Sequence, residues 1–153
     1  MVTIHPWNSQ WATHFKTLNI EWLEKYFHVE AIDEKVLSNP HHIIDQGGSI
    51  LFAAHGDAII GCCALLQHQS GVFELTKMAV TANQQGLGTG RLLLQAVIDE
   101  FKRLNGKLLY LESHSSLKTA LRLYEKYGFS HKPHPFKSKY SRSDVYMEWL
   151  PDA

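Results

Sequence analysis

The 153 residues predict an α/β (α+β) fold: a mixed sheet, antiparallel in its first part, with helices packed on it. Three observations carry this prediction. Strand-like runs follow one another with tight turns between them, which is typical of an antiparallel meander. A long amphipathic helix and a shorter one then alternate with apolar runs of strand length. The chain is 44% hydrophobic and 20% charged, the balance of one globular domain over residues 1–153.

The elements follow from local patterns, in chain order. Apolar side chains at helical spacing predict helices, and β-rich runs bounded by Gly, Pro or Asn predict strands. The expected helices are 11–26, 33–37, 87–104 and 117–127, with a loop at 41–48. The expected strands are 2–5, 49–55, 58–67, 72–80, 107–112, 129–132 and 144–149. This amounts to six to seven strands flanked by about four helices.

Composition excludes several classes of protein. Lys and Arg number 15, as do Asp and Glu, so the formal charge is zero and a general nucleic-acid binder is not expected. The first 76 residues carry a net charge of −5 and the remaining residues a net charge of +5. This division fits a protein that binds one cationic and one polyanionic ligand, or a surface whose charges are simply unevenly distributed. No run approaches a transmembrane helix, so no membrane partner is expected. A reducing, cytoplasmic setting is the default.

The two cysteines and ten histidines indicate neither a disulfide nor a metal site. Cys62 and Cys63 are adjacent in a predicted strand, so their side chains point to opposite faces. The histidines are scattered over predicted loops and strand ends, with no cysteine pair and no HExxH helix. We therefore expect no bound metal.

The most informative segment is a glycine-rich turn between a strand and the long helix, Gln85-Gly-Leu-Gly-Thr-Gly-Arg91. Glycines let backbone N–H groups turn toward one point, and the helix N-terminus adds its positive dipole end, which together favour phosphate. The spacing is not that of a P-loop, because Arg91 follows the last glycine. It is not the dinucleotide fingerprint either, whose last glycine would fall at Arg91.

The turn fits the pattern Gln/Arg-x-x-Gly-x-Gly/Ala, filled by Gln85, Gly88 and Gly90. It resembles the coenzyme A pyrophosphate loop of the GCN5-related N-acetyltransferase (GNAT) superfamily. The resemblance runs from about Ser49 to Phe129 and includes the strand before the loop and the helix around Tyr124. It implies the GNAT fold, acetyl-CoA as co-substrate and transfer of an acetyl group to a primary amine by direct attack in a ternary complex.

The resemblance also implies which residues hold the cofactor. Backbone amides of the strand before the loop would hold the pantetheine and the thioester carbonyl, and the loop would hold the pyrophosphate. The implied cofactor-binding residues are Met78, Ala79, Val80, Gln85, Gly86, Leu87, Gly88, Thr89, Gly90 and Arg91. A basic stretch with Lys132, Lys137, Lys139 and Arg142 would meet the nucleotide 3′-phosphate or only water.

Two side chains are the expected catalytic residues. Tyr124 matches the tyrosine that protonates the departing thiolate in many members, and the alternative is a core aromatic like Tyr127. Glu74 matches a glutamate that serves some members as general base. Alternatively, Glu74 is an ordinary surface residue or forms an ion pair with Lys77. In either of these cases the general base is His114 or water.

The acceptor stays open: a small amine, an amino acid or a peptide. Two other functions are compatible with the same residues. One is a non-catalytic module that binds or senses acyl-CoA, and the other is an acyltransferase that uses another acyl-CoA. Dimers are common among the similar proteins, so a homodimer is an alternative to a monomer.

Overall fold

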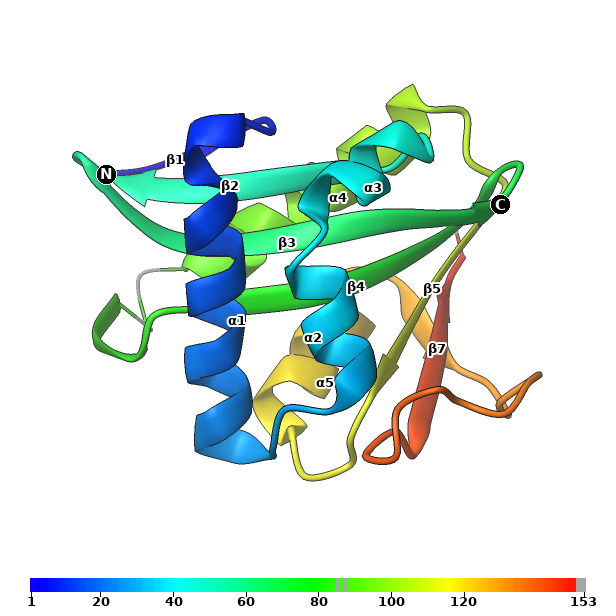
Figure 1. Ribbon diagram of the computed structural model, residues 1–153. Helices are drawn as coiled ribbons and strands as arrows, with labels where there is room; N and C mark the ends of the chain where they lie inside the picture. The colour runs from blue at the N-terminus through cyan, green and yellow to red at the C-terminus, as the bar shows by residue number, and fades with distance from the viewer. Residues whose placement is uncertain (85, 87, 151–153) are drawn as a thin grey trace.

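The computed structural model describes residues 1–84, 86 and 88–150, and within them it forms one seven-stranded sheet in the order β1-β2-β3-β4-β5-β7-β6 (Figure 1). The strands are β1 Val2–His5, β2 Ser49–His55, β3 Ala58–Gln69, β4 Val72–Val80, β5 Leu108–Ser113, β6 Phe129–His131 and β7 Val145–Trp149. The helices are α1 Ala12–Tyr26, α2 Ala31–Leu37, α3 Pro40–Asp45, α4 Thr89–Arg103 and α5 Lys118–Lys126. Single 3₁₀ turns lie at Ser9–Trp11 and Ala82–Gln84.

The sheet is mixed and mostly antiparallel, as the sequence predicts. β1 to β4 form an antiparallel meander, and β7 pairs antiparallel with both β5 and β6. β4 and β5 are parallel, joined through α4, because a parallel connection needs a crossover. This parallel pair lies in the middle of the sheet and becomes important for the site.

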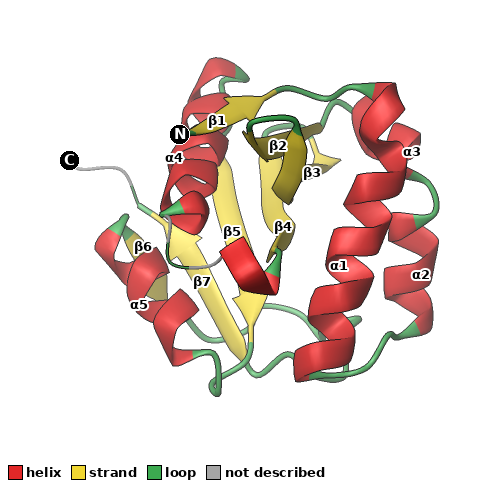
Figure 2. Cartoon of the chain, turned by 90° about the vertical axis from the view of Figure 1, so that its left-hand side faces the viewer, coloured by secondary structure: helices red, strands yellow, loops and turns green. Residues whose placement is uncertain are grey.

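The helices form a layer on each face of the sheet (Figure 2). Helices α1, α2 and α3 cover one face, and α4 and α5 lie on the other. Each face has its own buried cluster, and the adjacent cysteines divide between them. Cys62 packs with Phe15 and Phe52 on the α1 side, whereas Cys63 packs with Leu93 on the α4 side. The prediction that the two thiols point apart is therefore confirmed.

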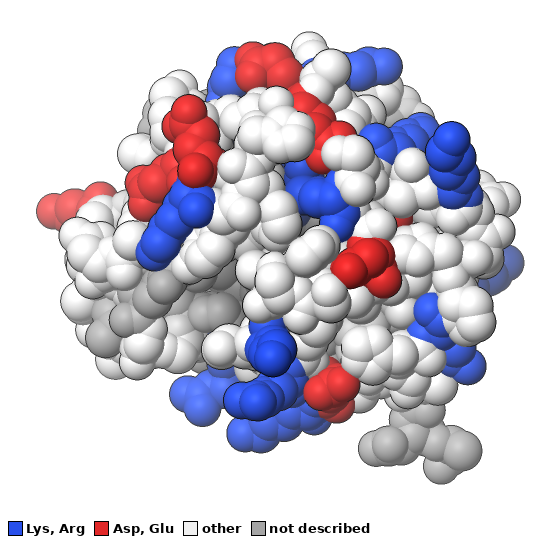
Figure 3. All heavy atoms as spheres, turned by 90° about the horizontal axis from the view of Figure 1, so that it is seen from below, with Lys and Arg blue, Asp and Glu red and all other residues white. Residues whose placement is uncertain are grey.

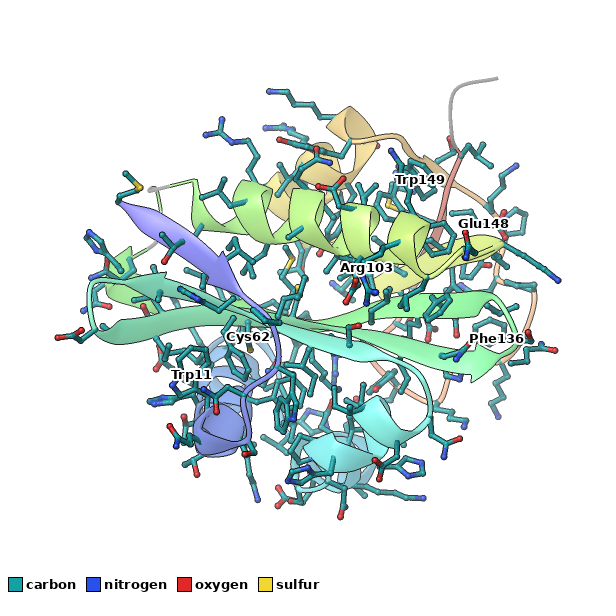
Figure 4. The ribbon with its side chains drawn as sticks, turned by 90° about the horizontal axis from the view of Figure 1, so that it is seen from above. Trp11, Cys62, Arg103, Phe136, Glu148 and Trp149 are labelled. Carbon is teal, nitrogen blue, oxygen red and sulfur yellow. The ribbon has the colours of Figure 1, made fainter. Side chains whose placement is uncertain are left out.

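Figure 4 shows the same division from above, with Trp11 and Cys62 on the side of α1 and with Trp149 toward the side of α4. Burial raises the pKa of the Cys62 thiol to about 12, so it stays protonated at neutral pH. Both cysteines are fully buried, which fits a packing role.

The structure has five α-helices within its described residues, one more than the sequence predicts. The expected loop over residues 41–48 is wrong, because Pro40–Asp45 forms α3. Pro40 stands at the first helical position, where its fixed φ favours a helix and its missing N–H costs nothing. The Asn39-Pro40 pair thus ends α2 and also begins a new helix. No helix among the described residues is long and apolar enough to cross a membrane.

Candidate active site

A cleft lies where the pairing of β4 with β5 ends. Their parallel pairing runs from Val72 opposite Leu108 to Leu75 opposite Leu111, and the strands then diverge. The cleft has a volume of about 1020 Å³. Its walls come from β4, β5, α1, the start of α4 and α5. A ligand in this gap would meet strand backbone on two sides.

A β-bulge in β4 bends the strand at the cleft. Cys62 faces Ala79 and Ala64 faces Thr76, so Lys77 and Met78 together oppose Cys63 alone. Lys77 has a φ of 56°, a left-handed conformation that is costly for a residue with a side chain. Bulges bend a strand and re-aim its groups, and this one lies where β4 leaves β5.

The glycine-rich turn forms one end of the cleft. All the described residues of the implied cofactor set line the cleft: Met78, Ala79, Val80, Gly86, Gly88, Thr89, Gly90 and Arg91. Gln85 and Leu87 lie outside the described residues. Gly88 has a φ of 76° immediately before α4, which explains why a glycine is needed there. The first turn of α4 therefore presents its N-terminus to the cleft.

Basic side chains surround this end of the cleft. Arg91 of α4 and Lys118, Arg122 and Lys126 of α5 all line it, and all four are exposed. Figure 3 shows Lys and Arg side chains gathered along one side of the hollowed face. A helix N-terminus together with a basic rim suits a polyanionic ligand such as a pyrophosphate.

Tyr124 lines the cleft from α5. Its ring meets Phe129 edge to face, with 5.9 Å between centroids. Burial raises the pKa of its phenol to about 12, so it carries its proton across the neutral range. Tyr127, three residues later, packs against the same core cluster as Tyr124 but lies outside the cleft lining. Of the two side chains, only Tyr124 lines the cleft as well as contacting the core.

Glu74 also lines the cleft, but it is not the surface residue that one alternative describes. Only 5% of Glu74 is exposed, and its Oε1 lies 2.9 Å from Nε2 of His68. The other alternative, a pair with Lys77, is wrong as well, because the Nζ of Lys77 lies 2.7 Å from Asp33. A buried carboxylate in a cleft has the placement of a general base.

A mostly buried ionic cluster borders the cleft, which two of its members, Lys77 and Arg142, line directly. It consists of Glu30 and Asp33 at the start of α2, Lys77 at the β4 bulge, and Arg142 before β7. Arg142 donates two hydrogen bonds to Asp33, at 2.7 and 2.9 Å, and one to Glu30 at 3.0 Å. Lys77 also donates to the hydroxyl of Tyr140, at 3.1 Å. The cluster joins three segments that are distant in sequence.

This cluster corrects the expectation for Arg142. Instead of meeting a phosphate or water, its guanidinium is held by two carboxylates. Sequence reasoning missed Asp33 and Glu30 as members of the site. The one signal for them was a helix start: Glu30 and Asp33 form a reciprocal capping box at the beginning of α2.

His114 is half-buried and lines the cleft, with its Nδ1 2.7 Å from the Ser116 hydroxyl. Phe27 meets its ring edge to face and, with Trp22, forms an aromatic wall at the end of α1. Trp7 and Trp11 pack on the α1-side core. Among the described residues, no group of three His, Cys, Asp or Glu side chains is arranged to hold a metal.

The fold and this cleft define an acyl-CoA-type transferase architecture, and comparison with known proteins agrees. The model of the acetyltransferase (GNAT) family matches residues 7–129. The chain belongs to the acetyltransferase (GNAT) family. This confirms the resemblance drawn from the glycine-rich turn and its neighbouring elements.

Relatives in sequence carry the same family description. The chain is 32% identical over 90 residues to the uncharacterized N-acetyltransferase YsnE of Bacillus subtilis, covering 56% of this chain and 60% of that protein. It is 29% identical over 122 residues to the uncharacterized N-acetyltransferase C1271.07c of Schizosaccharomyces pombe, covering 75% and 74%. The match to YsnE thus spans less than two thirds of that relative.

Solved structures share the fold over nearly the whole chain. A GNAT-family acetyltransferase from Staphylococcus aureus superposes with a TM-score of 0.84 at 21% identity, covering 97% of this chain and 98% of that one. The yncA protein of Salmonella typhimurium, solved with acetyl-CoA, gives a TM-score of 0.78 at 18% identity, with 99% and 94% covered. The GNAT fold predicted from the sequence is confirmed.

Proposed function

We propose that the protein transfers an acetyl group from acetyl-CoA to a primary amine by direct attack in a ternary complex. The observation that carries the proposal is one cleft lined by a parted strand pair, a half-buried tyrosine and a buried carboxylate: Tyr124 and Glu74 both line it. These groups match the three demands of the reaction. The thioester carbonyl must be polarised, the ammonium must lose a proton and the leaving thiolate must gain one.

The cofactor end of the cleft fits acetyl-CoA, which as co-substrate supplies the thioester to be attacked. The α4 N-terminus and Arg91 would hold the pyrophosphate, and the basic side chains of α5 would meet the 3′-phosphate. Met78, Ala79 and Val80, beyond the last β4–β5 pair, would align the pantetheine arm and the carbonyl. Direct attack is favoured over a covalent acyl-enzyme because both cysteines are fully buried.

The acceptor end of the cleft fits a cationic amine. Glu74 and Glu112 line it, as does the ring of Tyr140. The Glu30–Asp33–Lys77–Arg142 cluster has two charges of each sign, so it adds no formal charge of its own. The two remaining carboxylates make this end attractive to an ammonium group. A small amine, an amino acid and a peptide amine all remain within that class.

The experiment that tests the proposal follows thiol release from acetyl-CoA with tyramine, spermidine, lysine ethyl ester and an alanyl peptide, with mass spectrometry of each amine. Thiol release that depends on an amine and yields the acetylated amine supports the proposal. Double-reciprocal plots of the initial rates whose lines intersect support a ternary complex. Binding of acetyl-CoA without turnover of any amine favours the sensing module. Faster release from propionyl-CoA or succinyl-CoA favours another acyl donor.

Replacing Glu74 by Gln is expected to lower kcat by about a hundredfold near pH 6.5, within the usual range of general base catalysis. The loss should shrink toward high pH, because the amine then arrives without its extra proton. Gln keeps the size of the side chain and a group that contacts His68. The matched control is Glu125→Gln, an exposed carboxylate that also pairs with a histidine, at 2.8 Å. A pH profile parallel to that of the wild type would reject Glu74 as the base.

A further inference from the structure

The carboxylate of Glu74 lies between the cleft and a partly exposed histidine. On one side it lines the cleft. On the other, its Oε1 is 2.9 Å from Nε2 of His68, whose side chain is 38% exposed while that of Glu74 is 7% exposed. His68 is not among the described residues that line the cleft. The pair therefore forms a short hydrogen-bonded path from the cleft to solvent.

The sheet fixes this arrangement. Glu74 of β4 faces Leu66 of β3, and a bulge at His68 interrupts the register between Gln67 and Gln69. Bulges re-aim side chains, and here the imidazole of His68 reaches the carboxylate of Glu74. On the other side Glu74 faces Tyr110 of β5. The ring of Tyr110 stacks on the imidazole, with 5.9 Å between centroids and 23° between the planes. The imidazole is held against the carboxylate by a strand register and an aromatic contact.

Among the described residues, none of the other groups around Glu74 is placed to accept a proton from it near neutral pH. Burial, and after it the charge of Glu74, raises the pKa of the phenols of both Tyr110 and Tyr140, so both stay protonated. The Nζ of Lys77 already donates hydrogen bonds to Asp33 and to the hydroxyl of Tyr140. Glu112, the other carboxylate on this face, accepts from Ser143 and contacts His134. Imidazole is the side chain that takes up and releases protons between about pH 5 and 8.

We propose that His68 carries the proton removed by Glu74 from the cleft to solvent, and so restores the base for the next turnover. This rests on the proposed function and on Glu74 as its base. The acceptor N–H bond breaks, its proton goes to Glu74, and the electron pair stays on the nitrogen that attacks the thioester. Glu74 then passes the proton to Nε2 of His68 in the tautomer protonated at Nδ1, the imidazolium loses its Nδ1 proton to water, and exchange with solvent restores that tautomer. Both side chains return to their starting charges.

Two variants of His68 separate proton transfer from simple positioning. His68→Gln keeps an N–H that can hold Glu74, and His68→Phe keeps a ring on Tyr110, but neither can carry a proton. In dilute buffer both substitutions should lower kcat about tenfold. This is part of the rate enhancement of about 10²–10⁴-fold that general base catalysis supplies. Added imidazole should restore most of the loss, because the position is open to solvent. The KM for acetyl-CoA should not change. The acceptor is the amine that gives the fastest thiol release in the screen above.

The matched control is His131→Gln. The Nε2 of His131 lies 2.8 Å from Glu125, and both side chains are about half exposed, outside the described lining of the cleft. This variant should keep the wild-type kcat and should not respond to imidazole.

Several outcomes would overturn the proposal. Wild-type kcat in His68→Gln, with a loss only in His68→Phe, means that His68 merely orients Glu74. A loss in both that imidazole does not restore means a structural role. In either case Glu74→Gln would still lose activity at low pH, so the base itself would stand. No amine-dependent release by the wild-type protein would instead overturn the proposed function.

Discussion

Replacing Asp33 by Asn is expected to lower the free energy of unfolding by about 3–5 kcal/mol, as when one partner of a buried ion pair is removed. Asp33 is fully buried and accepts hydrogen bonds from both Lys77 and Arg142. Asn cannot neutralise either cation, and only 4% of the Lys77 side chain is exposed, so water can solvate its ammonium group very little. The loss is a large share of the 5–15 kcal/mol that a domain of ordinary stability has. Urea denaturation at pH 7 measures it.

Glu34→Gln is the control on the same helix. Glu34 pairs with Lys16 at 2.7 Å, but its side chain is 54% exposed, so the change should lower the free energy of unfolding far less than Asp33→Asn does. A comparably small loss in Asp33→Asn would show that water reaches the cluster and that its charges need no partner.

The effect of Asp33 should also depend on pH. Burial would raise the pKa of Asp33, but hydrogen bonds from Arg142 and Lys77 outweigh it and lower the pKa to about 2. A carboxyl whose pKa is lower in the folded state contributes its stability above its unfolded pKa and loses it as the pH falls through the folded one. The difference between wild type and Asp33→Asn should therefore be full above about pH 4 and shrink toward pH 2.

Tyr124→Phe is expected to lower kcat by about tenfold to a thousandfold, because the thiolate then leaves without a general acid. Among the described residues no protein group hydrogen-bonds to the Tyr124 hydroxyl, so its removal should change stability little. With its pKa at about 12, the phenol stays protonated, and no loss of activity from its ionisation should occur below about pH 11. Single-turnover thiol release at saturating acetyl-CoA measures the chemical step.

The control is Tyr127→Phe. Tyr127 lies on the same face of the chain's last helical turn but packs on the core, so its hydroxyl is not expected to affect kcat. An unchanged rate in Tyr124→Phe, with chemistry shown to limit the rate, would remove Tyr124 from the mechanism and leave water as the acid.

Local patterns were sufficient to predict most of the fold. The meander, the parallel crossover through α4 and the glycine before it are all encoded within short stretches of sequence. The exception was α3, where Asn39-Pro40 was interpreted only as a stop signal. Proline at the first position of a helix is equally favourable, and six residues offer too short a period to show amphipathicity.

The candidate site was predictable only in part, because its decisive contacts are remote in sequence. Asp33 meets Lys77 across 44 residues and Arg142 across 109, and no local pattern connects them. The contact of Glu74 with His68 was also not predictable, because strand alternation is interrupted at His68. The β3–β4 register depends on bulges at Lys77 and Met78, opposite Cys63, and at His68, which the sequence does not mark.

The acyl-CoA site between β4 and β5 underlies every catalytic step proposed above, and thermal unfolding with acetyl-CoA, CoA, NAD or ATP tests it most directly. At about 100 times Kd, a ligand adds about 2.7 kcal/mol. Since 1 kcal/mol corresponds to about 2–4 °C for a domain of this size, Tm should rise by about 5–10 °C with acetyl-CoA and with CoA. NAD and ATP should leave Tm nearly unchanged. No shift with either form of coenzyme A would mean that the glycines form only a turn, and the proposed transferase activity would be contradicted.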